Sequence, residues 1–259
     1  MSQAISIEYP SVDLGGFPVQ SLTAPILGQK LERAIDEKKQ ISLFFANTNF
    51  VVKCQDIRES ILKSNCVITN DGVGLDIASL LLYKKKFPEN LCGTDFVPQF
   101  LIDIKQKARV FLLGAKPGIA DRAAKNMREH LGITVVGARD GYSQMQDIDK
   151  VINDINTSEA NIVIVAMGNP LQEKWILDHQ HSLNANIFMG VGALIDFLAG
   201  DKPRAPVVFR KLRLEWLYRL SLEPTRLLRR YTLDIGIFLA LCLNAERNKS
   251  KWVEKHNEQ

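Results

Sequence analysis

The sequence predicts an α/β protein, with a mostly parallel sheet that carries helices on both faces. Short runs of β-branched or aromatic residues alternate with amphipathic stretches along the chain, as in consecutive βαβ units. Several of these runs are apolar throughout, for example 110–113 and 162–166, which is typical of strands covered on both faces. Glycine-rich turns follow the runs, as the connections of such a sheet require.

Six short apolar runs are the predicted strands: Ile41–Phe45, Val67–Thr69, Val110–Leu113, Thr134–Gly137, Ile162–Ala166 and Ile187–Met189. Four stretches with apolar residues at helical spacing are the predicted helices: Ile57–Leu62, Leu75–Leu82, Ile119–Leu131 and Asp147–Ile155. Gly132 follows the third of these helices, at the position where a glycine often ends a helix.

Four loops rich in glycine or turn residues directly follow predicted strands, at residues 70–72, 114–118, 168–170 and 190–192. In open α/β sheets, ligands bind outside the carboxyl ends of the strands. We therefore expect these four loops to lie along one edge of the sheet and to share a site.

Composition sets limits on the class of protein. The chain has 259 residues, 46% of them hydrophobic, and a net charge of +4, which excludes a disordered chain and does not indicate a nucleic-acid partner. The segment from Lys202 to Arg230 contains nine Lys and Arg residues and only two Glu residues, so the positive charge is concentrated there. The composition changes near Gly200, which predicts a core over 1–200 and a basic helical segment over 201–259.

The compartment is predicted from what the sequence lacks. The four cysteines form neither a C-x-x-C pair nor a metal-ligand spacing, which favours reduced thiols in the cytoplasm. No basic stretch followed by an apolar one stands at the N-terminus, so we expect no signal peptide. No run approaches the roughly 18 apolar residues that a membrane-spanning helix needs.

Asp71 follows a short apolar strand, between Asn70 and Gly72. A carboxylate at such a strand end can act as a general base on a bound substrate. The alternative is that Asp71 only caps the next helix or shapes an Asp-Gly turn, which is the more frequent use of such a residue. Both interpretations stay open at this point.

The other three loops offer contacts for a phosphate or a sugar. Gly114 to Gly118, with Lys116 between them, either lets backbone N–H groups approach a phosphate or forms an ordinary tight turn. After Gly168 and Asn169, Pro170 suits a helix start, which places Gln172 and Glu173 in the first helical turn. Gln172 is a candidate to bind a sugar hydroxyl or a diphosphate oxygen, whereas Glu173 also suits the positive helix end.

Cofactor signals are weak. Gly190 and Gly192 give half of a dinucleotide fingerprint, but Ile195 stands where the third glycine is needed. Asp147 and Asp149 form a D-x-D pair, yet they open an amphipathic helix, where Asp is favoured as a cap. His179 and His181 are more typical of a solvated helix end than of a metal site. We expect neither a metal nor another cofactor.

The basic C-terminal segment has two interpretations. It is either a solvated helix face or an interfacial element whose arginines meet anionic lipid headgroups while its apolar side chains enter the membrane. The interleaved apolar residues favour the second: Trp216, Leu217, Leu220, Leu227, Leu228 and Phe238. Nucleic acid is disfavoured because the segment is too apolar.

The order of these motifs resembles the WecG/TagA/CpsF family of glycosyltransferases over roughly residues 41–243. The motifs that carry the resemblance are NDGVG at 70–74, GTD at 93–95, GAKPG at 114–118, GNPLQEKW at 168–175, GVGA at 190–193, RAP at 204–206, LEWLYRL at 214–220 and EPTR at 223–226. Within the family, the sequence looks most similar to the xanthan-type glucosyltransferases.

The resemblance implies an inverting, metal-independent enzyme with a Rossmann-like catalytic domain over 1–200. It would move a sugar from a UDP-sugar, with glucose favoured, to a polyprenyl-diphosphate-linked saccharide in exopolysaccharide or cell-surface polysaccharide biosynthesis. The enzyme would work at the inner face of the cell membrane, and a homo-oligomer is left open as a partner. The segment 201–259 would dock on the membrane and complete the active site.

The resemblance also assigns roles to residues. Asp71 takes the general-base position and Gln172 that of an active-site glutamine, with Thr94 and Asp95 among the substrate-binding residues. The family's Thr-x-Asn strand end corresponds to residues 47–49, where Asn47 replaces the threonine and Asn49 is kept. An arginine frequent before Gly93 is absent, since Asn90-Leu91-Cys92 stands there. The diphosphate charge would be met by Arg210, Arg213 or an arginine of 226–230.

Three alternatives remain open. Within the family, the transferred sugar is N-acetylmannosamine or its uronic acid. Outside it, the same fold serves nicotinamide-dependent oxidoreductases, which the broken glycine fingerprint disfavours. The chain is otherwise a non-catalytic peripheral membrane scaffold, and the fold alone does not decide between these classes.

Overall fold

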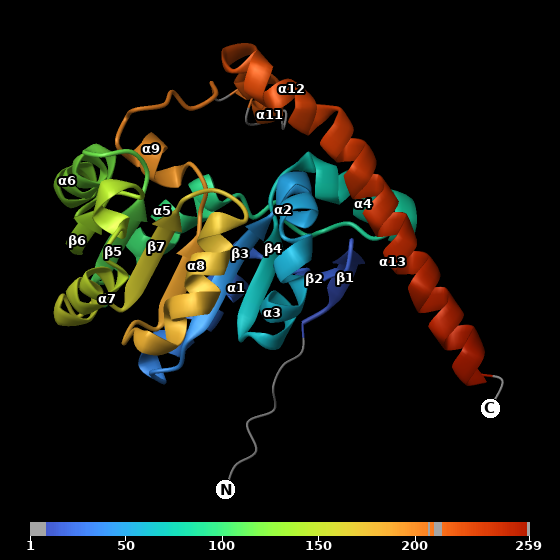
Figure 1. Cartoon of the computed structure of the whole chain (residues 1–259), viewed down its shortest axis with the longest axis horizontal. Helices are drawn as coiled ribbons and strands as arrows, with labels where there is room; N and C mark the ends of the chain where they lie inside the picture. Colours follow the sequence, from blue (N-terminus) through green and yellow to red (C-terminus); the bar gives the residue numbers. More distant parts are fainter. Residues whose placement is uncertain (1–8, 207, 210–213, 258–259) are drawn as a thin grey trace, which may run out of the picture.

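The computed structural model describes residues 9–206, 208–209 and 214–257 of the chain. It confirms an α/β fold with one mostly parallel sheet flanked by helices (Figure 1). Within the described ranges the sheet has eight strands in the order β1-β2-β4-β3-β8-β7-β5-β6. Only β1 and β2 pair antiparallel. The strands are β1 Ser11–Leu14, β2 Phe17–Gln20, β3 Ile41–Ala46, β4 Cys66–Asn70, β5 Val110–Gly114, β6 Val135–Arg139, β7 Ile162–Ala166 and β8 Ile187–Gly190.

All six predicted strands are confirmed, as β3 to β8, with ends that differ by one or two residues at most. The hairpin of β1 and β2 was not predicted. Each of its strands is only four residues long, too short to show a clear alternation. The turn uses Gly15 and Gly16 at φ 65° and 87°, a conformation that favours glycine.

Two apolar layers cover the sheet because side chains alternate along each strand. In β3, for example, Leu43 and Phe45 enter one layer and Phe44 the other. The first layer contains α1 Ala24–Asp36, α5 Gly93–Asp103, α6 Ile119–Leu131 and α9 Leu194–Leu198. The second contains α2 Thr48–Lys53, α3 Arg58–Lys63, α4 Val73–Tyr83, α7 Ile148–Thr157, α8 Leu171–His179 and part of α13 Leu233–Asn257.

The four predicted helices are confirmed as α3, α4, α6 and α7. Gly132 ends α6 in the left-handed conformation, at φ 65°. Asp147 caps α7 by accepting a hydrogen bond from the Lys150 N–H at 3.0 Å, as the cap interpretation predicts. Helices α1, α2 and α5 were not among the predicted elements.

The C-terminal segment forms α11 Glu215–Leu222, α12 Pro224–Tyr231 and α13. In Figure 1, α11 and α12 lie beyond the carboxyl ends of the strands, and α13 runs back along the molecule. Helix α13 contacts α2, β1 and α4. Its length and these particular partners were not predicted.

Two of the side chains predicted to enter a membrane are instead buried in the protein. Phe238 is 1% exposed and packs in the second apolar layer, because α13 uses this face to cover α2 and β1. Leu227 is 3% exposed on α12, which packs against α11 and α13. The prediction that these two residues enter a bilayer is therefore wrong, whereas Leu217 and Leu228 are exposed. Among the described residues, we find no helix that combines the length and apolarity needed for crossing a membrane.

Candidate active site

The four predicted loops lie along one edge of the sheet, as expected. They follow β4, β5, β7 and β8, and these strands are parallel to one another and to β3. Neighbouring strands are about 4.8 Å apart, so the ends of β4 and β7, three positions apart in the sheet, are separated by about 14 Å. One extended ligand lying along the edge can therefore contact several loops.

Asp71 lies at the end of β4, where its backbone N–H bonds to the Ala46 carbonyl at the end of β3, at 2.7 Å. The next residue, Gly72, has φ 97° and occupies the N-cap position of α4 without a side-chain cap. The alternative that Asp71 is the N-cap residue of α4 is therefore wrong, whereas its role in an Asp-Gly turn stays open. Asp71 is half-buried at the carboxyl edge of the sheet. It is therefore partly accessible to a ligand at this edge.

The segment before α5 holds the Asp71 loop in place. Asn90 accepts a hydrogen bond from the Gly72 N–H through Oδ1 at 2.6 Å. Asn70 is fully buried and donates from Nδ2 to Asp76 at 3.0 Å and to the Glu89 carbonyl at 2.9 Å. Its Oδ1 is buried without a hydrogen-bond partner. These hydrogen bonds therefore hold the loop in place, and the Asn70 Oδ1 acceptor in it remains unsatisfied.

Arg219 of α11 is the described arginine that lies close to Asp71. It is bound to Glu215, one turn earlier, by hydrogen bonds at 2.6 and 3.1 Å, and its guanidinium stacks on Phe197 at 5.0 Å from the ring centre. Burial disfavours its charge, but the carboxylates of Glu215 and Asp71 outweigh this and raise the pKa of Arg219. The C-terminal segment thus brings a positive charge to the end of β4.

Cys92 and Thr94 lie beside the same loop, with Cys92 Sγ 2.9 Å from Thr94 Oγ1. Burial raises the pKa of the Cys92 thiol, and the charge of Asp71 raises it further. Asp95, in the first turn of α5, binds Arg204 at 2.7 Å. This ion pair attaches the start of the C-terminal segment to α5.

Gln172 connects two of the glycine loops. Its Oε1 accepts hydrogen bonds from the N–H groups of Gly168, at 3.2 Å, and Gly192, at 2.9 Å. Its Nε2 donates to Glu173 at 2.8 Å. A side chain at Gly190 would come within 3.0 Å of that Nε2. Gln172 is 2% exposed, so the structure gives it a positioning role, and direct contact with substrate stays a prediction.

Glu173 is fully buried beneath the loop at the end of β7. Its Oε1 also accepts from Asn169 Nδ2 at 2.7 Å, and the Cys54 thiol lies 3.8 Å from Oε2. Burial raises the pKa of Glu173 above its ordinary value, although these donors partly compensate. Pro170 is the N-cap residue of α8, so the predicted helix start is confirmed.

The end of β3 contributes Asn47 and Asn49. Asn47 caps α2 by accepting from the Phe50 N–H at 3.1 Å. Asn49 donates from Nδ2 to Asn169 Oδ1 at 3.0 Å, which ties the start of α2 to the loop after β7. Both residues lie at the edge where the sequence placed them.

The loop after β5 is tightly packed at one end and open at the other. Gly114 has φ 126°, and a side chain there would come within 2.3 Å of the Ala166 carbonyl oxygen. This requirement supports the tight-turn interpretation for Gly114. Gly118 is the N-cap of α6, with open space where a side chain would stand. Lys116 is exposed and interacts electrostatically with Asp196.

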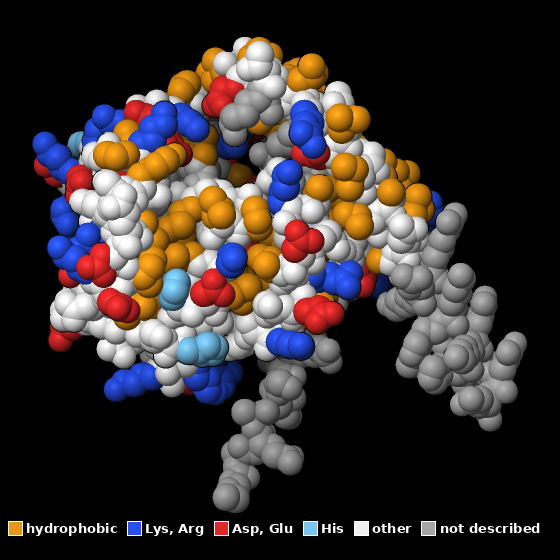
Figure 2. Space-filling model, viewed as in Figure 1, with side chains coloured by type: hydrophobic (Ala, Val, Ile, Leu, Met, Phe, Trp, Pro, Cys, Tyr) orange, Lys and Arg blue, Asp and Glu red, His pale blue; other side chains and the backbone are white. Residues whose placement is uncertain are grey.

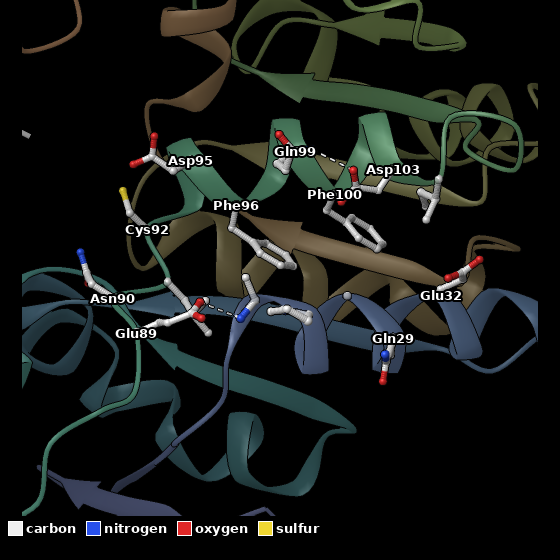
Figure 3. A pocket seen from close by; sticks show the side chains of 15 residues that line it. Gln29, Glu32, Glu89, Asn90, Cys92, Asp95, Phe96, Gln99, Phe100 and Asp103 are labelled. Atoms are coloured by element: carbon white, nitrogen blue, oxygen red, sulfur yellow. Dashed lines mark hydrogen bonds between the residues drawn. The ribbon is translucent and has the colours of Figure 1, made fainter. Parts of the chain in front are cut away.

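A groove of about 580 Å³ runs between α1 and α5 (Figure 3). Asn90, Cys92 and Asp95 line the end nearest the Asp71 loop. Its walls also carry Glu32 and Asp103, so the groove is acidic. Acidic walls repel a diphosphate, and we therefore place the candidate site at the strand ends rather than in this groove.

No group of three or more His, Cys, Asp and Glu side chains that could hold a metal ion occurs among the residues that the structure describes. Asp147 is occupied as a helix cap. His179 packs against Trp175 at 5.1 Å between ring centres. These contacts account for two of the side chains that the sequence left as possible ligands, Asp147 and His179.

Sequence reasoning missed the contributions of Arg219, Arg204 and Asn90. The predicted arginines Arg210 and Arg213 lie outside the described residues. Glu215 and Arg219, spaced as an ion pair on one helix face, were visible in the sequence. Their proximity to Asp71 depends on how α11 packs and leaves no local signal.

Comparisons with known proteins concern the chain as a whole. Residues 12–252 match the family described as Glycosyl transferase WecG/TagA/CpsF family. A relative from Bacillus subtilis (strain 168), N-acetylglucosaminyldiphosphoundecaprenol N-acetyl-beta-D-mannosaminyltransferase, is 30% identical over 252 residues, which cover 96% of this chain and 94% of the relative. The predicted closeness to xanthan-type glucosyltransferases stays a prediction.

Proposed function

The chain belongs to the WecG/TagA/CpsF family of glycosyltransferases, and on that premise we propose that it transfers N-acetylmannosamine from its UDP derivative to polyprenyl-diphosphate-linked N-acetylglucosamine. The name of the B. subtilis relative, which states both the transferred sugar and the acceptor, supports this choice. N-acetylmannosamine thereby replaces glucose, which the sequence alone favoured.

The observation that carries the proposal is the electrostatic interaction between Arg219 of α11 and Asp71 at the end of β4. In the proposed step, the Asp71 carboxylate takes the proton of an acceptor hydroxyl. The hydroxyl oxygen then bonds to the anomeric carbon of the donor, and the bond from that carbon to the diphosphate breaks on the opposite face. The reaction therefore inverts the anomeric centre.

The leaving diphosphate gains negative charge in this step, and positive groups that are already in place lower the barrier. Arg219 is one such group. The N-terminus of α6, which starts after the open Gly118, and that of α8 are others, because helix N-termini favour anions. We propose that these groups replace a metal, so EDTA should leave turnover unchanged.

The two parts of the chain have distinct proposed roles. Residues 1–200 supply the Rossmann-like catalytic domain, and 201–259 form an appendage that delivers arginine and docks at the inner face of the cell membrane. The Arg219 and Arg204 contacts support the first role of the appendage. Its exposed Leu217 and Leu228 support the second.

A transfer assay tests the proposal. The purified protein is incubated with polyprenyl-diphosphate-linked N-acetylglucosamine and, in separate reactions, with radiolabelled UDP-N-acetylmannosamine, UDP-glucose and UDP-N-acetylmannosaminuronic acid. We expect label on the lipid from UDP-N-acetylmannosamine. Transfer from UDP-glucose alone would overturn the sugar assignment, and transfer from no UDP-sugar would overturn the proposed activity.

A further inference from the structure

Helix α4 is apolar on two opposite faces. On one face Leu75 and Ala78 are fully buried in the second apolar layer. The opposite face carries Ile77, Leu80 and Leu81, which are 50%, 41% and 61% exposed. A helix that is apolar all round normally has partners on all sides. The second face of α4 is therefore an apolar surface that stays largely exposed among the described residues.

Positive charge lies directly beside this face. Lys84 ends α4 in the left-handed conformation, at φ 55°, and Lys84, Lys85 and Lys86 are all exposed. Apolar side chains beside a cluster of cations are typical of helices that lie in the membrane interface. Anionic headgroups complement the lysines, and the acyl boundary complements the apolar side chains.

The surface continues onto α13, which contacts α4. Leu233 and Ile237 are 64% and 47% exposed there. Figure 2 shows hydrophobic side chains gathered on the surface of the molecule where α13 passes α4. Exposed apolar side chains thus occur on both helices, on the core as well as on the C-terminal segment.

The position of α4 places this surface next to the Asp71 loop. The helix begins at Val73, two residues after Asp71, and is 11 residues long, so the lysines lie about 16 Å from its start. We propose that the α4 ridge, defined as Ile77, Leu80, Leu81 and Lys84–Lys86, rests on an anionic lipid bilayer and holds Asp71 close to the membrane surface. The inference rests on the proposed function only in that it needs a lipid-linked acceptor.

The test is vesicle co-sedimentation of the full chain with two double variants. Ile77→Ser with Leu81→Ser removes apolar contacts, and we expect partitioning onto phosphatidylglycerol-containing vesicles to fall about tenfold. Lys85→Glu with Lys86→Glu should lower it at least ~25-fold, since each lysine near an anionic surface contributes about fivefold. On purely zwitterionic vesicles the lysine variant should bind like the wild type.

A matched control separates the ridge from general surface apolarity. Ile26 on α1 and Leu62 on α3 are 37% and 45% exposed, and Ile26→Ser with Leu62→Ser should bind vesicles like the wild type. Circular dichroism and thermal melting check that each variant is folded. Equal vesicle binding by the wild type and both ridge variants would overturn the proposal.

Two further measurements distinguish this inference from the proposed function. Ridge variants should keep wild-type turnover on a short-chain, water-soluble acceptor and lose turnover on the same acceptor embedded in vesicles. No turnover by the wild type on the soluble acceptor counts against the proposed activity and leaves the binding result to stand. If the wild type is an oligomer that Ile77→Ser with Leu81→Ser converts to a monomer, a second copy covers the ridge and the membrane proposal is overturned.

Discussion

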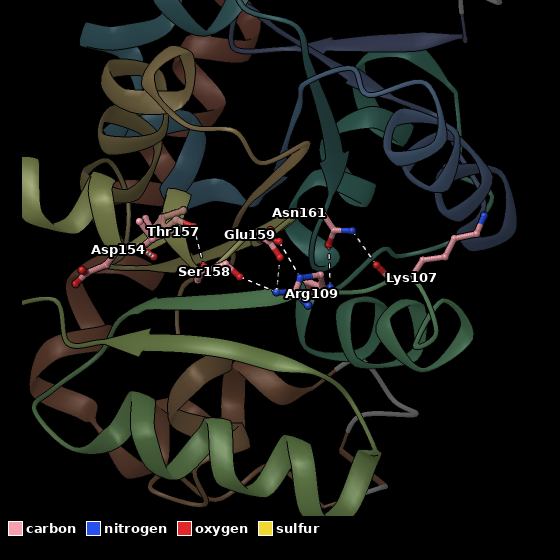
Figure 4. Close-up of polar contacts among 8 residues, drawn as sticks. Lys107, Arg109, Asp154, Thr157, Ser158, Glu159 and Asn161 are labelled. Atoms are coloured by element: carbon pink, nitrogen blue, oxygen red, sulfur yellow. Dashed lines mark hydrogen bonds and ion pairs between the residues drawn. The ribbon is translucent and has the colours of Figure 1, made fainter.

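The two edges of the central sheet are built differently, although the same strands reach both. At the amino edge, side chains bind the loop backbone: Gln40 donates to the carbonyls of Gln180 and Leu183. Arg109 donates to the carbonyls of Ser158 and Glu159 at 2.8 and 2.9 Å (Figure 4). These loop carbonyls thus accept hydrogen bonds from side chains of the same protein.

The carboxyl edge has open space over its turns instead. Gly72, Gly118, Gly168 and Gly192 all have positive φ there, and a side chain on any of them would stand in open space. Asn70 Oδ1 is buried without a hydrogen-bond partner. The comparison teaches that hydrogen bonds hold the loops of both edges in place, whereas only the carboxyl edge combines them with open space over its glycine turns. Substitutions at the carboxyl edge should therefore lower turnover more than stability, and substitutions at the amino edge should lower stability more than turnover.

The largest effect is expected for Asp71→Asn. Loss of a general base should lower turnover by about 10²–10⁴-fold, because the amide cannot take the proton of the acceptor. The transfer assay measures the loss, and thermal melting should show an intact fold. Asp149→Asn, an acidic residue in the first turn of α7, is the control and should keep activity. Near-wild-type turnover in Asp71→Asn would remove Asp71 from the mechanism.

Arg219→Gln should come next, with turnover about 10²-fold lower, because the positive charge beside Asp71 is lost. Arg128 makes a comparable set of contacts away from this edge, to the Val135 carbonyl, so Arg128→Gln should be nearly as active as the wild type. Similar losses in both variants would mean that Arg219 acts through the fold rather than on the substrate.

Glu173→Gln tests the buried acid of the carboxyl edge by pH. Because the folded pKa of Glu173 is raised, its contribution to stability is complete below the unfolded pKa and is lost as pH rises through the folded value. A glutamine does not titrate and keeps an oxygen for Asn169 and Gln172. Urea unfolding between pH 4.5 and 8 should therefore show the variant gaining stability relative to the wild type as pH rises. A difference that does not change with pH would contradict the assignment.

The smallest effect on activity is expected for Arg109→Ala at the amino edge. The lost hydrogen bonds should reduce the free energy of unfolding by about 1–2 kcal/mol, and turnover per folded molecule should not change. Urea unfolding and the transfer assay measure the two quantities on the same preparation. A clear loss of turnover at unchanged stability would contradict the claim that the amino edge serves stability and not activity.

The sequence predicts the six strands that build the parallel part of the sheet and the loops that follow four of them, because both signals are local. Asp71, Gln172 and the glycines are found in this way. Arg219 and Asn90 are not, since their proximity to Asp71 arises from tertiary packing. Phe238 was assigned to a membrane because its apolar helix face looks the same in sequence whether it meets lipid or the core.

The central claim, that the donor nucleotide binds at the carboxyl edge, is tested most directly by titrating the ¹⁵N-labelled protein with UDP and following backbone amide signals by NMR. We predict shifts for Gly118, Gly168 and Gly192 and none for Arg109 and Asn161 at the amino edge. Shifts confined to the amino edge, or no shift at saturating UDP, would contradict the account.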